Sequence, residues 1–322
     1  MSGHRILLLT AAALLCAAPL GMGNYQSYLA QLIMINVIGA LGLNLLTGNC
    51  GQISLCHASF MAVGAYTSAL LTTRFGLSFA VGISIGTLAA AGLGAALGFP
   101  ARRLSGLYLA LVTLGFLELV QTVVEEFPNL TGGVRGLSVP KPQVLGIQIR
   151  SDTALYYVAL AITAFAVWSA RNVVRSRFGR AFNAVRQSPY AAQAVGISLG
   201  RTKLLAFSLA AGFAGLAGGL QAIVVGFIDP TEFGISTSLR QITFIVVGGL
   251  GSVPGSVIGA IVLTGLPELL RGVQEYSDLV YGAILLAVLL FMPRGVIGLL
   301  DALRGRVGKW WMKSPNRSEL ES

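Results

Sequence analysis

The chain has 322 residues, of which 55% are hydrophobic and only 11% are charged, and its formal net charge is +10. Soluble domains carry about 25% charged residues, so this composition excludes a soluble globular protein and predicts a polytopic membrane protein. The positive charge does not indicate nucleic-acid binding, because the basic residues fall in loops and in the tail rather than on one soluble face.

Apolar runs follow one another along almost the whole chain. Most have the roughly 20 residues that a helix needs to cross about 30 Å of hydrocarbon. Because backbone groups cannot stay unpaired in lipid, we expect helices, and an all-α transmembrane bundle of about eight to ten spans. The runs are 6–22, 27–47, 55–73, 78–99, 107–124, 153–170, 204–225, 237–249, 255–269 and 278–297.

The first run, 6–22, is open to two interpretations: a cleaved signal peptide or a first span. It follows Arg5 and is about long enough to cross a bilayer. We favour the uncleaved span.

A glycine-containing break separates the runs 27–47 and 55–73. Gly48 and Gly51 are its predicted hinge residues. Three polar side chains near this break are candidates for a solute pathway: Asn44, Gln52 and His57. The alternative for Asn44 and Gln52 is that they satisfy freed backbone groups, and for His57 that it hydrogen-bonds between helices.

Small residues recur every four positions in the run 78–99, at Gly82, Gly86, Ala90, Gly94 and Gly98. This spacing places them on one helix face, where small side chains allow close helix packing in a membrane. We expect a structural role for this stripe.

The run 107–124 contains Glu118, the only acid well inside a predicted span, and Gln121. Polar groups within spans usually face the bundle interior or an aqueous path, so both are pathway candidates. A structural carboxyl is the alternative for Glu118. A proton-coupled carrier is a second hypothesis for the whole chain, but such carriers commonly keep charged relays, and Glu118 stands alone.

The loop 127–152 is the main external segment when the positive-inside rule sets the orientation. Placing Arg5 inside puts Arg102, Arg103 and the loop 171–203 inside as well, while Glu125, Glu126 and Asp152 fall outside. Both termini are then cytoplasmic, and 301–322 is a basic cytoplasmic tail behind a permease domain of residues 1–300.

The loop 171–203 is the longest polar interruption, with seven basic residues and no acid. Proline disfavours the α region for its predecessor, so Ser188-Pro189 predicts two short helices within this loop. A structured cytoplasmic loop in a membrane protein indicates a docking element.

A second glycine-rich break lies between 237–249 and 255–269. If 237–269 were one crossing, the basic tail would be outside, so we expect the chain to turn back here. Either both short helices cross, giving ten spans, or they form a re-entrant pair. The predicted break residues are Gly248, Gly249, Gly251, Pro254 and Gly255.

Enzyme chemistry is not indicated by any motif. The segment Gly305-Arg306-Val307-Gly308-Lys309 lacks P-loop spacing, and there is no HExxH. The three cysteines have no zinc spacing. We expect no catalytic residue, no metal site and no cofactor.

The chain resembles the membrane permease subunits of branched-chain amino acid ABC importers, specifically the M-type subunit. The resemblance covers nearly the whole chain from residue 25. It is carried by LNLLTGNCGQISLCHASFMAVGAY (43–66), RLSGLYLALVTLGFLELV (103–120), LTGGVRGL (130–137), GRAFNAVRQSPYAAQAVGI (179–197), KLLAFSLAAGFAGLAGGLQA (203–222), VVGGLGSVPGSVIGA (246–260) and FMPRGVIGLL (291–300).

The resemblance implies a multi-pass permease of the bacterial inner membrane that works by alternating access. Its implied partners are the lipid bilayer, a sister permease in a heterodimer, two cytoplasmic ABC ATPases and a periplasmic solute-binding protein that docks near 127–152 and 226–240. The implied substrates are branched-chain amino acids, although urea and short-amide importers use closely similar permeases.

The resemblance also implies a cytoplasmic coupling helix within 171–203. The family pattern Glu-Ala-Ala, three residues, then Gly has its spacing here at Tyr190 to Gly196, with Tyr in place of Glu. Arg180 and Arg186 could pair with acids on an ATPase. The implied coupling residues are Arg180, Arg186, Ser188, Pro189, Tyr190, Ala191, Ala192 and Gly196.

Overall fold

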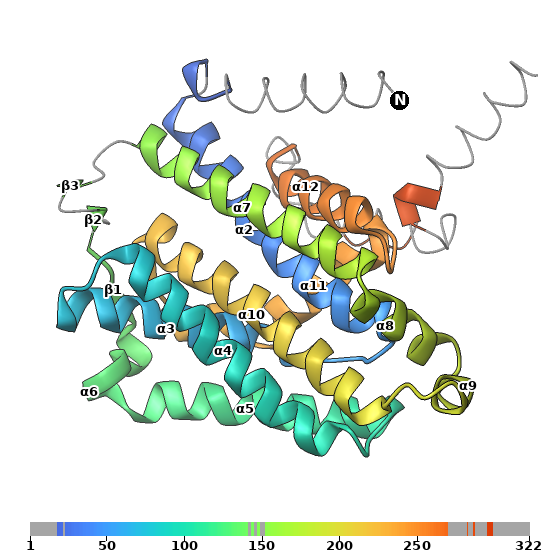
Figure 1. Ribbon diagram of the computed structural model, residues 1–322. Helices are drawn as coiled ribbons and strands as arrows, with labels where there is room; N and C mark the ends of the chain where they lie inside the picture. The colour runs from blue at the N-terminus through green and yellow to red at the C-terminus, as the bar shows by residue number, and fades with distance from the viewer. Residues whose placement is uncertain are drawn as a thin grey trace, which may run out of the picture.

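The structure is a computed structural model, and it describes residues 18–21, 23–140, 143–144, 147–148, 152–269, 282, 286 and 295–298. These residues are mostly helical, and their few strands are two residues long (Figure 1). The predicted all-α polytopic bundle is confirmed. The runs 6–22 and 278–297 lie mostly outside the described residues, and the tail 301–322 lies wholly outside them.

Within the described part, five helices are long and apolar enough to cross a membrane. They are Asn24–Asn49, Phe79–Ala101, Gly106–Glu126, Thr153–Arg175 and Leu199–Val225. A bent pair, Ile235–Gly248 with Val253–Glu268, could add a sixth span. The predicted total of eight to ten spans depends on residues beyond those described.

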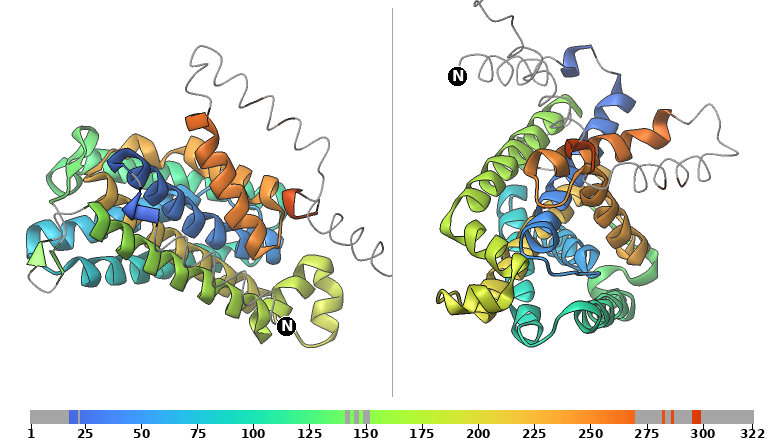
Figure 2. Two further views of the ribbon diagram at one scale, coloured as in Figure 1. Left: turned by 90° about the horizontal axis from the view of Figure 1, so that it is seen from above. Right: turned by 90° about the vertical axis from the view of Figure 1, so that its right-hand side faces the viewer.

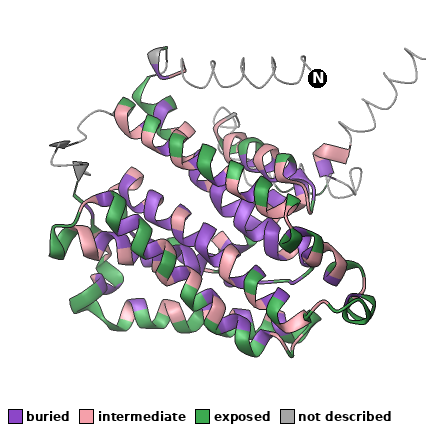
Figure 3. Cartoon of the chain, in the orientation of Figure 1, coloured by how far each residue is buried: buried purple, intermediate pink, exposed green. Residues whose placement is uncertain are grey.

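Helix α2 (Asn24–Leu43) occupies the centre of the bundle. It packs against α7 (Asp152–Arg175) and α10 (Leu199–Val225), and its residues from Val37 to Leu43 are all buried (Figure 3). A helix that is apolar on every side belongs in the interior of a bundle. The π-helix η2 (Asn44–Asn49) continues α2 without a gap.

The small-residue stripe of α4 (Phe79–Ala101) packs against α3 (His57–Phe75) and α10. A Cβ on Gly86 would lie 2.7 Å from the carbonyl oxygen of Gly64, and one on Gly94 would lie 2.7 Å from that of Phe207. Such distances exclude a side chain, so the stripe brings the backbones together. The predicted packing role is confirmed.

Helix α5 (Gly106–Glu126) leaves much of its surface uncovered, as does α7. Large apolar side chains such as Leu111 and Leu119 on α5, and Phe165 and Trp168 on α7, are exposed. Exposed apolar side chains on a membrane span suit contact with lipid or with a partner's helix.

One end of the bundle, here called the strand end, contains the short elements of the loop 127–152 (Figure 1). These are α6 (Pro128–Thr131), η3 (Gly133–Arg135), β1 (Leu137–Ser138), β2 (Gln143–Val144) and β3 (Ile147–Gln148). Strand β1 pairs antiparallel with β4 (Phe227–Ile228), which is followed by η4 (Pro230–Phe233). The loop is therefore tied to the segment that follows α10.

The opposite end carries α8 (Arg177–Gln187) and α9 (Pro189–Ala194), which project beyond the other helices (Figures 1 and 2). Ser188 ends α8 and caps α9, because its hydroxyl accepts a hydrogen bond from the amide of Ala191 at 3.3 Å. Pro189 occupies the first turn of α9, where its missing N–H costs nothing. The predicted division at Ser188-Pro189 is confirmed.

Helices α11 (Ile235–Gly248) and α12 (Val253–Leu269) meet at a bend of 119°. Gly249 and Gly251 have φ of 123° and 84°, which L side chains rarely adopt. The chain turns back here, and the hydroxyl of Tyr25 at the start of α2 lies 2.5 Å from Oε2 of Glu268. The second break is confirmed, but Pro254 and Gly255 lie in the first turn of α12 rather than in the break.

Candidate functional site

The two glycine breaks, distant in sequence, lie against each other. Oδ1 of Asn44 accepts a hydrogen bond from the amide of Gly251 at 2.8 Å, and Nδ2 of Asn44 donates to the carbonyl of Ser252 at 3.1 Å. Nδ2 of Asn49 also donates to the carbonyl of Gly251, at 3.4 Å. We call residues 44–52 together with 249–252 the junction.

Glycine at position 48 is what lets the two segments of the junction meet. A Cβ there would lie 1.9 Å from Oδ1 of Asn44 and 2.5 Å from the amide nitrogen of Gly251. The wider turn of the π-helix brings Gly48 to this position, and π-turns are frequent at functional sites. Gly48 therefore lies within a helix rather than in the break.

Arg186, the penultimate residue of α8, reaches the junction. Its Nη1 donates to the carbonyl of Gly48, 138 residues earlier in the chain. A Cβ on Gly51 would lie 3.0 Å from its Cγ, and one on Gly251 would lie 2.9 Å from its Nη1. The Arg186 side chain thus contacts both breaks, and its guanidinium forms a hydrogen bond within the chain.

The segment 50–56, between η2 and α3, has irregular backbone and is partly buried: Cys50 and Cys56 are fully buried, whereas Gly51 and Ile53 are exposed. Side chains from neighbouring helices pair its backbone groups. The hydroxyl of Thr113 on α5 accepts from the amide of Leu55 at 3.0 Å, and just beyond the segment that of Ser238 on α11 accepts from the amide of Ala58, in the first turn of α3, at 3.1 Å. Irregular backbone is tolerated at membrane depth when it is buried and paired in this way.

The polar candidates near the first break are all engaged in the interior. His57 is buried and its Nε2 lies 2.9 Å from the carbonyl oxygen of Gly39 on α2. The side-chain Nε2 of Gln52 donates to the carbonyl of Cys50 at 3.3 Å, and the backbone carbonyl of Gln52 accepts from the Thr47 hydroxyl at 3.0 Å. Asn44, Gln52 and His57 therefore each pair with backbone groups of the chain.

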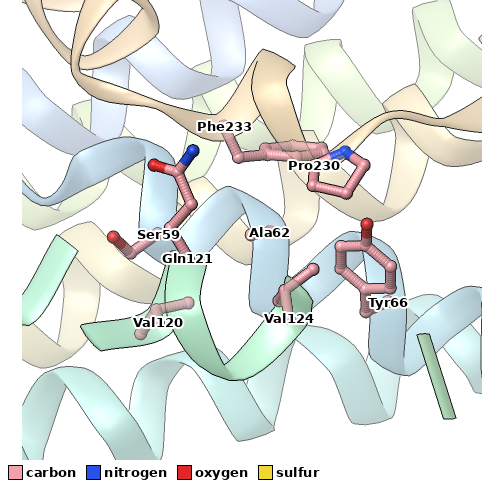
Figure 4. Close-up of a pocket in the computed structure, with 8 residues that line it drawn as sticks. All are labelled: Ser59, Ala62, Tyr66, Val120, Gln121, Val124, Pro230 and Phe233. Carbon is pink, nitrogen blue, oxygen red and sulfur yellow. The ribbon is translucent and has the colours of Figure 1, made fainter. Parts of the chain in front are cut away.

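Glu118 and Gln121 lie apart from the junction. The Glu118 side chain is on the exposed surface of α5. Gln121 donates to Glu125 at 3.4 Å and lies beside Ser59 of α3 at a cavity of about 10 Å³ (Figure 4). That volume holds about one water molecule, so this cavity is far too small for an amino acid.

Helix α9 presents an apolar surface at the projecting end. Tyr190 and Val195 are 85% and 76% exposed, whereas Ala192 is buried against the rest of the chain. Gly196, at φ 83°, lets the chain fold back, so that the amide of Ile197 bonds to the carbonyl of Ala192 at 2.9 Å. We call the exposed residues Tyr190, Ala191, Gln193 and Val195 the α9 surface.

Arg180 is also exposed, and its Nη1 donates to the carbonyl of Arg175 at 3.2 Å. Its guanidinium therefore stays on the outside of α8. Both arginines are exposed residues of α8, but Arg186 bonds to the Gly48 carbonyl of the junction, whereas Arg180 bonds to a carbonyl at the end of α7.

A large cavity at the strand half of the bundle was not expected from the sequence. It has a volume of about 800 Å³ and lies between α2, α10, α11 and α12. Glu232, Gln221 and Arg240 are among its lining residues. Arg240 was overlooked because it falls within a run counted as apolar, and its charge was the signal that could have identified it.

The described residues contain no group of three or more His, Cys, Asp or Glu side chains that could hold a metal ion. Cys50 and Cys56 are free thiols, and both are buried.

Comparisons with known proteins identify a family of transport-system permeases. The family profile described as branched-chain amino acid transport system / permease component matches residues 25–289. The chain is 35% identical over 319 residues to the high-affinity branched-chain amino acid transport system permease protein LivM of Escherichia coli K12, covering 91% of this chain and 75% of LivM.

Two further relatives are more distant. The permease protein LivH of the same system in Escherichia coli K12 is 30% identical over 285 residues, covering 80% of this chain and 90% of LivH. The autoinducer 2 import system permease protein LsrC of Salmonella paratyphi B is 29% identical over 315 residues, covering 91% and 84%. No solved structure matches the chain.

Proposed function

The chain belongs to the permease family of branched-chain amino acid transport systems, and on that premise we propose that it is one permease subunit of an ATP-driven ABC importer for branched-chain amino acids. It forms half of the translocation pathway, and a sister permease forms the other half. ATP hydrolysis takes place on partner subunits.

We orient the subunit in the bacterial inner membrane with α8 and α9 in the cytoplasm. The seven basic residues of 171–203 and the absence of acids there support this orientation. The strand end then faces the periplasm, where the paired segments β1 and β4 offer a surface for a solute-binding protein. Both termini are cytoplasmic.

The α9 surface is the proposed docking element for an ATPase subunit. Its exposed Tyr190 and Val195 suit a cleft on a partner, since exposed apolar residues outside the membrane mark interaction sites. Arg180, on the open surface of α8, is available to pair with an acid of the ATPase. Ser188, Pro189 and Gly196 shape the two ends of α9.

One observation supports the mechanism above all others: Arg186 connects α8 to both breaks. Movement of α9 by the ATPases passes along α8 to the Gly48 carbonyl, and through Asn44 to Gly251 and Ser252. Gly51, Gly248, Gly249 and Gly251 are the hinge residues beside this connection. ATP binding then favours one of two packings of similar free energy.

The proposal is tested by reconstituting the complete complex in proteoliposomes with the solute-binding protein. We expect leucine uptake that requires ATP on the side of the ATPases and is unaffected by a pH gradient. Uptake by this chain alone, driven by a pH gradient without any ATPase, would contradict the proposal and support the proton-coupled carrier.

A further inference from the structure

The cavity of about 800 Å³ has the size and lining of a small-molecule site. Binding pockets for small molecules typically measure about 300–1,000 Å³ and combine apolar walls with a few polar groups. Here Leu29, Leu32, Met61, Val225 and Leu263 supply apolar wall. Polar and charged groups are set among them.

Arg240 is an exposed charged residue in the first half of α11, next to a residue that contacts the middle of a neighbouring span. Its neighbour Gln241 donates to Oδ1 of Asn36 at 3.0 Å, and Asn36 is midway along the span Asn24–Asn49. A charged side chain at the middle of a membrane span is costly, and such residues usually mark a substrate or ion path. Arg240 is one of the residues that line the cavity.

Among the residues that the structure describes, Arg240 has no hydrogen-bond or ion-pair partner. A guanidinium is always charged and offers a planar set of donors that matches a carboxylate. An arginine in this position, directed at a cavity, is therefore suited to an anionic group of a bound molecule.

A carboxylate stands on the same cavity wall. Glu232, in η4, lines the cavity, and its Oε2 accepts a hydrogen bond from Gln221 of α10 at 3.0 Å. Gln221 also lines the cavity and holds the carboxylate in place. Positive and negative side chains thus share one cavity whose remaining wall is largely apolar.

We propose that this cavity binds the transported α-amino acid as a zwitterion. Arg240 binds the α-carboxylate, Glu232 attracts the ammonium group, and the apolar wall receives the aliphatic side chain. The inference rests on the proposed import function and assigns its substrate contact to this subunit. It also gives the permease a means of selecting amino acids over neutral amides.

The test measures protection of an introduced cysteine by leucine in the complete complex. Thr237 lines the cavity beside Arg240, so Thr237→Cys is prepared in a background with Cys16→Ser, and Cys50 and Cys56 are buried. A membrane-impermeant thiol reagent is applied from the strand side, with and without leucine. We expect leucine to slow labelling at least fivefold.

Two comparisons make the result specific. Adding Arg240→Gln should abolish protection, whereas the matched change Arg201→Gln, at the opposite end of the bundle, should preserve it. Isopentylamine, which has the side chain and amine of leucine but no carboxylate, should not protect.

Equal protection in the Arg240→Gln variant, or none in the Thr237→Cys parent, would overturn the proposal. If Arg240→Gln instead reduced recovery of the sister permease, Arg240 would be an intersubunit contact. The proposed import function would still hold in each of these cases if the parent complex takes up leucine with ATP. Loss of ATP-dependent leucine uptake in the parent complex would instead contradict the import function.

Discussion

The junction and the cavity differ in how their polar side chains are placed: those of the junction are paired and closely packed, whereas those of the cavity face open volume. At the junction, Asn44 has both ends of its amide paired, and Gly48 leaves no room for a single extra carbon. At the cavity, Arg240 and Glu232 face open volume. A tightly paired region transmits displacement, because it resists compression, whereas an open polar region can receive a solute. The helical bundle thus has one region suited to transmitting displacement, the junction, and another suited to binding a solute, the cavity.

The largest effect is expected for Gly48→Val, which tests whether the junction is as tight as its contacts indicate. The added Cβ would overlap Asn44 and Gly251, so the two breaks must separate. We expect a destabilisation of at least about 3 kcal/mol, measured as loss of folded protein and a lower melting temperature in detergent. Gly92→Val, on α4 with nothing near its Cβ position, is the control and should have little effect.

The next prediction compares one substitution at the junction with one at the cavity. Asn44→Leu leaves the amide of Gly251 unpaired, at a cost of about 1–3 kcal/mol, while the carbonyl of Ser252 keeps its bond from the amide of Ser256. Arg240→Gln removes a charge that has no partner among the described residues, so the melting temperature should stay the same or rise. Equal destabilisation by both changes would remove the distinction between the two regions.

A smaller effect is expected at the α9 surface. Tyr190→Ser removes the most exposed apolar side chain of α9 without touching the fold, and interface aromatic residues often contribute more than 1 kcal/mol. We expect about tenfold weaker retention of the ATPase subunits, measured by co-purification at decreasing concentration. Gln187→Ser, at an exposed position at the end of α8 and outside the α9 surface, serves as the control. Similar retention in both variants would place the docking contact elsewhere.

The smallest effect is expected for Glu118→Gln. Glu118 lies on the exposed surface of α5, away from both the junction and the cavity. Surface substitutions usually change free energies by less than about 0.5 kcal/mol, so leucine uptake should fall by less than about twofold. Loss of uptake in a normally assembled complex would make Glu118 part of the pathway, on a face shared with the sister permease.

Local signals made much of the fold predictable from the sequence. Glycine and proline act on their own backbone, so both breaks and the division at Ser188-Pro189 were visible. The stripe from Gly82 to Gly98 was visible for the same reason, since its spacing is that of one helix face. The exact ends of the helices were not predictable. The helix before the first break continues to Asn49, because Gly48 lies within a π-helical turn.

Long-range pairings could not be predicted from the sequence alone. The partners of Asn44 lie more than 200 residues away, and nothing local indicates that the two breaks meet. Arg186 was expected to pair with acids on an ATPase, like Arg180, and composition alone could not show that its guanidinium bonds to the Gly48 carbonyl. Gly248 and Gly251 were expected to bend the chain, whereas their contact with the first break depends on how the helices pack.

Arg186 is the proposed connection between the docked helices and the junction, and the ratio of leucine imported to ATP hydrolysed tests this connection most directly. Arg186→Ala removes the bond to Gly48 and leaves the α9 surface intact. In the reconstituted complex we expect its ATP hydrolysis to stay within about twofold of the parent while uptake falls at least about tenfold, since hydrogen bonds to charged groups contribute about 1.5–3 kcal/mol. Arg180→Ala should keep the parental ratio. An unchanged ratio in Arg186→Ala would contradict the account.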